Sequence, residues 1–149
     1  MAITQAMATS FKVEILDGIH NFGVGVVRAT TAADTFKIAL YTSAANLDAT
    51  TTAYTTSGEV VGTGYTAGGN TLAVSVVPVS SGTTAYLSFT NSSWSTATIT
   101  ARGAMIYNSS QGDKCVAVLD FGADKVSTAG TFTIVFPTAA AGTAIIQIA

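Results

Sequence analysis

The chain has 149 residues, of which 48% are hydrophobic and only 9% are charged, and its formal net charge is −2. An ordinary soluble domain carries roughly 25% charged residues, and here Thr and Ser, roughly a quarter of the chain, supply most of the polarity. The length suits one domain with a hydrophobic core. Because charge keeps chains apart in solution, this composition favours a protein that packs against copies of itself or another assembly. An ordinary β-protein that tolerates few charges is the alternative.

The low charge also argues against several classes of partner. Lys and Arg are scattered and form no basic patch or arm, so we expect no direct binding of nucleic acid. No run of about 18 apolar residues is present, so we expect no membrane span. The N-terminus lacks the basic start and apolar run of a signal peptide. The single cysteine, Cys115, begins an apolar alternation and is predicted to be a buried small side chain rather than a reactive thiol.

The first predicted element is a short helix over residues 10–18, where apolar side chains recur at helical spacing. Thr9 or Ser10 would cap its start, and Gly18 would end it. Apolar residues in the same stretch also alternate, which leaves a strand as the competing interpretation. We expect residues 1–33 to form an N-terminal arm that contains this helix.

From residue 34 onward the pattern is that of β-strands. Apolar alternation predicts strands over residues 36–41, 60–65, 72–77, 85–89, 98–107, 115–121, 131–136 and 144–148. Turn-forming residues separate them, among them Asn91-Ser92-Ser93 and Ala129-Gly130, and Gly103 is predicted to be a bulge or bend. Residues 34–149 are therefore expected to form an all-β antiparallel sandwich or jelly roll of about eight short strands. The last strand is expected to pair either internally or with a neighbouring subunit.

Residues 34–70 combine the first of these strands with a polar Thr/Ala loop and a glycine-rich stretch. The loop, residues 42–57, is too long for a simple hairpin. No Lys follows the glycines and no helix is predicted after them, so they do not indicate a phosphate-binding loop. We expect them to permit bends and positive φ in turns. They are Gly58, Gly62, Gly64, Gly68 and Gly69.

No set of residues predicts a catalytic, cofactor-binding or metal site. His20 is the only histidine, and no nucleophile elbow is present, so we expect a capping or packing role for it. Glu59 has no evident catalytic partner. The loop carboxylates Asp113, Asp120 and Asp124 lack calcium-loop spacing and are expected to be solvated. Trp94 could stack on a sugar, but core or interface packing is the usual role of Trp.

Several segments resemble a family of virion structural proteins of tailed bacteriophages. The most distinctive is Gly-Tyr-Thr-Ala-Gly-Gly at residues 64–69, part of a matching segment over residues 62–69, and the resemblance extends over nearly the whole chain. The other segments are residues 1–7, 10–12, 34–42, 52–54, 58–60, 97–104 and 117–122. Within such phages, a small β-protein of this size resembles a capsid cement or decoration protein.

The resemblance implies a short jelly roll that trimerises on the outer capsid surface of the virion, after assembly in the host cytoplasm. Its implied partners are the major capsid protein and further copies of itself, and it carries no enzymatic motif or cofactor. Loop 42–57 is then the expected contact surface. The alternative is a tail or fibre component that binds host surface carbohydrate, which predicts exposed aromatic side chains around Trp94 or the loop at residues 108–113.

Overall fold

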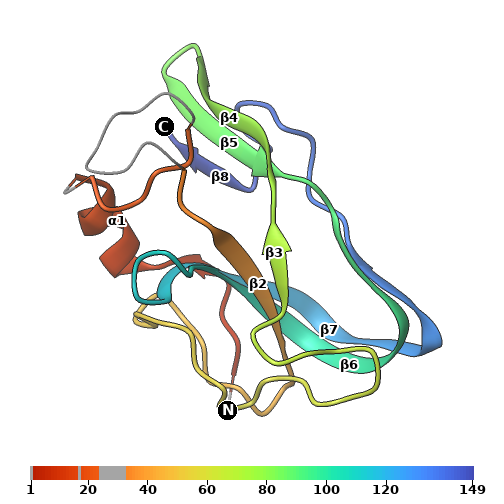
Figure 1. Cartoon of the computed structure of the whole chain (residues 1–149). Helices are drawn as coiled ribbons and strands as arrows, with labels where there is room; N and C mark the ends of the chain where they lie inside the picture. The colour runs from red at the N-terminus through yellow and green to blue at the C-terminus, as the bar shows by residue number, and fades with distance from the viewer. Residues whose placement is uncertain (1, 17, 24–32) are drawn as a thin grey trace.

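The computed structural model describes residues 2–16, 18–23 and 33–149. This part of the chain contains one helix and eight strands, and the strands form two antiparallel sheets (Figure 1). The larger sheet has the strand order β1-β7-β6-β2-β3, and the smaller has the order β4-β5-β8. The elements are β1 (Ala6–Met7), α1 (Thr9–Leu16), β2 (Phe36–Tyr41), β3 (Asn70–Leu72), β4 (Val74–Ser81), β5 (Thr84–Phe89), β6 (Ser92–Asn108), β7 (Lys114–Ile134) and β8 (Ile146–Ile148). The predicted all-β antiparallel class with a short N-terminal helix is confirmed.

The helix forms where it was predicted, so the competing strand is wrong. Gly18 adopts a φ of +67° beyond its end and donates its N–H to the Ile15 carbonyl at 3.0 Å. Strand β1 was not predicted, because two residues give no periodicity to recognise; it pairs with β7 at Ala117 and Val118. Phe11 of the helix belongs to the same buried cluster as the strands of both sheets.

The longest elements, β6 and β7, form one hairpin that reaches from the larger sheet toward the smaller one (Figure 1). The predicted strands at residues 115–121 and 131–136 are parts of a single strand, β7, and the break predicted at Ala129-Gly130 is wrong. Ala129 has a φ of +48° within β7, and register shifts in the pairing of β6 with β7 let the hairpin bend without ending. One shift lies between Ala101 and Gly103, as predicted for a bulge at Gly103.

Three further boundaries differ from those predicted. The turn predicted at Asn91-Ser92-Ser93 is wrong, because β6 begins at Ser92 and the Ser93 and Thr133 hydroxyls bond across the hairpin at 2.9 Å. The strand predicted over residues 72–77 is divided, with β3 in the larger sheet and β4 in the smaller. The strand predicted over residues 60–65 does not form. The last strand, β8, pairs internally with β5.

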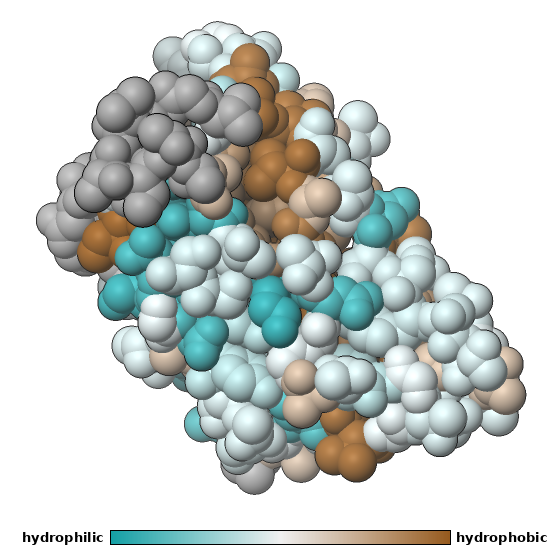
Figure 2. Space-filling view, viewed as in Figure 1, coloured by the Kyte–Doolittle hydropathy of each residue, from teal (hydrophilic) through white to brown (hydrophobic). Residues whose placement is uncertain are grey.

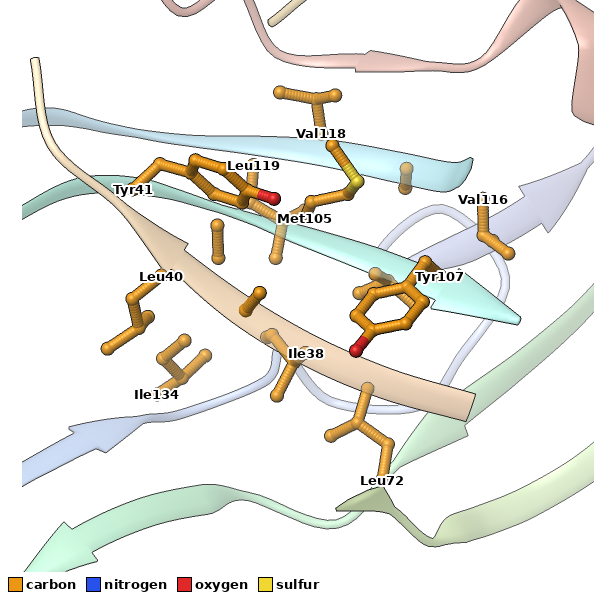
Figure 3. Packing of buried hydrophobic residues seen from close by; sticks show 14 of the residues in the cluster. Ile38, Leu40, Tyr41, Leu72, Met105, Tyr107, Val116, Val118, Leu119 and Ile134 are labelled. Carbon is orange, nitrogen blue, oxygen red and sulfur yellow. The ribbon is translucent and has the colours of Figure 1, made fainter. Parts of the chain in front are cut away.

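Strand β2 is buried at every position except Lys37, which is half-buried, because both of its faces are covered. Ile38 and Leu40 lie on the side of Leu72 and Ile134, where the second sheet packs (Figure 3). Tyr41 lies on the opposite side, where the segment between β2 and β3 crosses the sheet. The Tyr41 hydroxyl donates a hydrogen bond to the Thr55 carbonyl of this segment at 2.6 Å.

Candidate functional site

Residues 42–69 connect β2 to β3 and contain no regular strand or helix; we call them the strap. The strap continues the pairing along the outer edge of β2, which β3 covers only at Phe36–Ile38. The Val60 N–H donates to the Leu40 carbonyl at 2.9 Å, and the Thr42 N–H donates to the Gly58 carbonyl at 2.9 Å. The strap therefore protects a sheet edge that would otherwise be exposed to pairing with another chain.

Backbone hydrogen bonds also hold the strap to three distant segments. Each of the following bonds is 2.9 Å long: Thr4 N–H to the Leu47 carbonyl, Thr98 N–H to the Thr63 carbonyl, Cys115 N–H to the Thr52 carbonyl, and Tyr54 N–H to the Asp113 carbonyl. The strap is thus attached to the N-terminal segment, to β6 and to the turn that leads into β7. Such a loop has little conformational freedom left to lose when it binds something.

The centre of the strap is a buried carboxylate. Glu59 is 8% exposed, and its two carboxylate oxygens accept three hydrogen bonds. The Tyr54 hydroxyl donates to Oε2 at 2.6 Å, the Tyr65 hydroxyl donates to Oε1 at 2.7 Å, and the Gly68 N–H donates to Oε1 at 2.7 Å. Hydrogen bonds to an ionised acceptor are about twice as strong as neutral ones, so this carboxylate organises the strap around itself.

Tyrosines connect the Glu59 cluster to the sheet. The Tyr107 hydroxyl of β6 donates to the Gly68 carbonyl at 2.8 Å, and the Tyr107 ring stacks on Tyr54 with centroids 4.8 Å apart. The Leu40 N–H donates to the Tyr65 oxygen at 2.9 Å. Burial, helped by the negative charges of Asp113 and Glu59, raises the pKa of Tyr107 to about 12.

The tyrosines next to Glu59 are likewise held in their protonated form. Burial raises the pKa of Tyr65 and that of Tyr54 well above the ordinary value, and donation to Glu59 adds to both shifts. Every oxygen of the Glu59 carboxylate is occupied by a donor that the fold itself fixes. The arrangement is suited to holding a loop in shape, and it presents no activated nucleophile or base.

Glycines in the strap adopt the positive φ that was predicted for them, and they also let the strap approach the strands closely. Gly58, Gly64, Gly68 and Gly69 have positive φ. A Cβ at Gly69 would collide with the Ile38 carbonyl of β2, and one at Gly58 would lie 2.6 Å from the Ala45 Cα. Gly62 serves differently: its φ is not positive, and its missing Cβ makes room for the Thr98 carbonyl of β6.

The outer surface of the strap is small, polar and nearly uncharged. Its acidic residues are Glu59, which is buried, and Asp48, whose pKa is lowered by the Thr50 hydroxyl and N–H. Val61 is its one large aliphatic side chain among the exposed residues and is 96% exposed. The remaining exposed residues are Ser43, Ala44, Asn46, Thr50, Thr52, Thr56, Ser57, Thr63, Gly64, Thr66 and Ala67.

A second polar cluster surrounds His20 and confirms its packing role. Asn108 Nδ2 lies 3.0 Å from His20 Nδ1 and donates to Asp34 Oδ2 at 2.8 Å, while the Asn21 N–H donates to the same oxygen at 3.0 Å. The His20 ring packs edge-on against Phe11 at 4.7 Å. This cluster could not be predicted from the sequence, because 88 residues separate His20 from Asn108.

The other residues considered from the sequence do not gather into a site. Asp120 accepts hydrogen bonds from the Gly122 N–H at 2.9 Å and Arg102 Nε at 3.0 Å, and these hold the pKa of its carboxyl below the usual value. In the part of the chain that the structure describes, no three His, Cys, Asp or Glu residues form a metal-binding group. Cys115 is fully buried, as predicted.

Trp94 is 5% exposed and packs between Tyr65 and Phe132, with ring centroids 6.0 and 6.1 Å away. Its predicted core role is confirmed, and its indole face is not presented to solvent for a sugar. In the loop at residues 108–113, Asn108 is fully buried.

Among the helices within the described ranges, none has the length and apolar character needed to cross a membrane. Comparisons of the chain with protein-family models, with curated proteins and with solved structures found no match.

Proposed function

We propose that the chain is a non-enzymatic structural component of a tailed-phage virion, a cement or decoration protein that binds the outer capsid and stabilises contacts between capsomers. The observation that carries the proposal is the strap. It is a nearly uncharged, hydroxyl-rich surface whose shape is fixed by the Glu59 cluster and by backbone bonds to three other segments. The resemblance of residues 64–69 to phage structural proteins falls within this same surface.

The strap would act through a large number of weak contacts. A rigid surface loses little conformational entropy on binding, so less of the contact energy is offset by ordering. Repeated over every capsomer of a shell, such contacts add through multivalency. Burial of apolar surface contributes about 25 cal/mol per Å² as an upper value. The major capsid protein is the proposed partner.

The alternative, a tail or fibre component that recognises carbohydrate, needs an exposed aromatic platform. The burial of Trp94 removes the side chain on which that alternative chiefly rested. We therefore favour the capsid role.

The proposal is tested with two stocks of particles, grown with and without the chain, that are heated over a temperature series and assayed for DNA retained in the head. We expect heads without the chain to release DNA at a lower temperature, and purified chain added back to restore retention. Equal retention by both stocks would contradict the proposal. A matched control adds back a variant, Asp120→Ala, that leaves the strap intact and should restore retention fully.

A further inference from the structure

Residues 2–7 form an extended segment that lies between the strap and the outer edge of β7. On one side, the two residues of β1 pair with residues 117–118 of β7. On the other side, the Thr4 N–H donates to the Leu47 carbonyl of the strap at 2.9 Å. The segment therefore fills a slot that has backbone hydrogen-bonding groups along both of its walls.

One side chain anchors the segment in this slot. Ile3 is 8% exposed, whereas its neighbours at positions 2 and 4 are exposed. Its Cδ1 atom lies only 3.1 Å from where a Cβ of Gly103 would be, and that Cβ would also collide with the Leu119 carbonyl. The glycine thus leaves a notch in β6 that receives the isoleucine. Backbone pairing combined with a pocket for one side chain is the way in which sheets recognise an added strand.

The segment is held less firmly than the strands beside it. Among residues 2–7, only Ile3 is buried, and the bond from the Asp120 N–H to Gln5 Oε1 is long, at 3.4 Å. Elements with few buried apolar contacts open locally at a lower free energy than core strands do. Departure of the segment leaves an unpaired edge of β7 and an empty notch at Gly103, and an unpaired edge is a template for a strand from another chain.

We propose that this slot is a strand-acceptor site, and that residues 2–7 of a neighbouring copy occupy it in exchange for the chain's own. This occupant is the sequence whose fit the closed chain already demonstrates, so each backbone bond and the Ile3 contact are reproduced between copies. Ala8 is fully buried at the start of α1 and marks the hinge. The six residues beyond it span about 20 Å when extended, which is enough to reach a copy packed against the slot.

Effective concentration decides which segment fills the slot. The chain's own segment has the advantage in dilute solution, and exchange is favoured where copies lie side by side. Figure 2 shows the largest hydrophobic surface over the smaller sheet rather than over the strap, so the slot, not an exposed apolar patch, gives this contact its specificity. The contact does not depend on the capsid role.

The test joins two full-length copies through the slot. The donor carries Gln5→Cys and the acceptor carries Asp120→Cys, at two positions that meet in the closed chain, and the fully buried Cys115 of each copy is protected from the reagent. An equimolar mixture is treated with a short bis-maleimide, and the cross-linked heterodimer is quantified by mass spectrometry. The matched control acceptor carries Ser81→Cys, an exposed position on β4 in the other sheet. It should give about tenfold less heterodimer or lower still, because only an exchanged pair reacts at high effective concentration.

The Ile3→Ala substitution gives the sharper result, because its effect should change sign with the copy that carries it. In the donor it removes the anchor and should lower the heterodimer yield about tenfold or more. In the acceptor it loosens the competing segment and should raise the yield. Ile3→Val should show the same two signs with smaller changes, in case Ile3→Ala impairs folding. A yield no higher than that of the Ser81→Cys control, or a change of the same sign in donor and acceptor, would overturn the proposal.

Discussion

Replacement of Glu59 by Ala is the most informative perturbation of the strap, since it removes the acceptor of three hydrogen bonds at once. The Gly68 N–H is buried, and leaving it unpaired costs about 2 kcal/mol. Tyr54 and Tyr65 are half-buried, and their hydroxyls can turn partly toward water. Loss of each of these hydrogen bonds should therefore lower the free energy of unfolding by about 1 kcal/mol. The expected loss in the free energy of unfolding is about 4 kcal/mol, or roughly 8–16 °C in melting temperature for a chain of this length.

The assay is urea or thermal unfolding followed by circular dichroism, with Asp120→Ala as the matched control. Asp120 is also a carboxylate that accepts hydrogen bonds from a backbone N–H and a side chain, but it lies at the surface, where such pairs contribute little. Tyr54→Phe, which removes one donor and keeps the ring that stacks on Tyr107, should cause about a quarter of the loss. If Glu59→Ala costs no more than the control, the carboxylate does not organise the strap and the reasoning is refuted.

Gly69→Ala should lower the free energy of unfolding by more than about 2 kcal/mol, because it combines left-handed strain with a collision against the Ile38 carbonyl. The control, Gly112→Ala, has nearly the same φ (+64° against +67°) but open space around the new Cβ, and should cost about 1 kcal/mol. Equal costs for the two variants would contradict the close approach of Gly69 to β2. In an alkaline titration followed at the phenolate absorbance, the contribution of the tyrosines with raised pKa to stability should be complete below about pH 10. It should be lost as the pH rises through the raised pKa values, which begin at about 12 for Tyr107 and are higher for the others. Early ionisation of all five tyrosines would argue against the cluster. The shifted tyrosines are Tyr41, Tyr54, Tyr65 and Tyr107. The buried Cys115 thiol should react with Ellman's reagent only at the rate of unfolding; rapid reaction of the folded protein would show that the thiol is accessible.

Periodicity predicted the fold class and most strand positions, but it could not predict where strands continue or switch sheets. Ala129 and Gly130 are ordinary turn residues, and only the partner strand β6 keeps them in register within β7. Ala73 looks like the interior of one strand, yet β3 and β4 on either side of it belong to different sheets. Val60 and Val61 are adjacent valines that were placed in one predicted strand, but Val60 is buried and Val61 is exposed. The strap meets β2 only at an isolated bridge between Tyr41 and Glu59, so the predicted strand does not form.

The strap, too, was predicted only in part from the sequence. The sequence indicated a loop too long for a hairpin and glycines with positive φ, and both features are present. It did not indicate that Glu59 is buried. Its partners Tyr54 and Tyr65 lie five residues before it and six after it, and neither separation brings side chains together in a strand or a helix. Tyr107, which completes the cluster, arrives through the pairing of β6 with β2.

We have proposed that this chain lies on the outer surface of a phage head and meets its neighbours through the strap. Difference imaging by cryo-electron microscopy of intact particles, with and without the chain, tests it most directly. We expect extra density on the outside of the shell, oriented so that residues 42–69 face the capsid or an adjacent copy. Density confined to the tail, or a chain on the shell whose strap points into solvent, would contradict it.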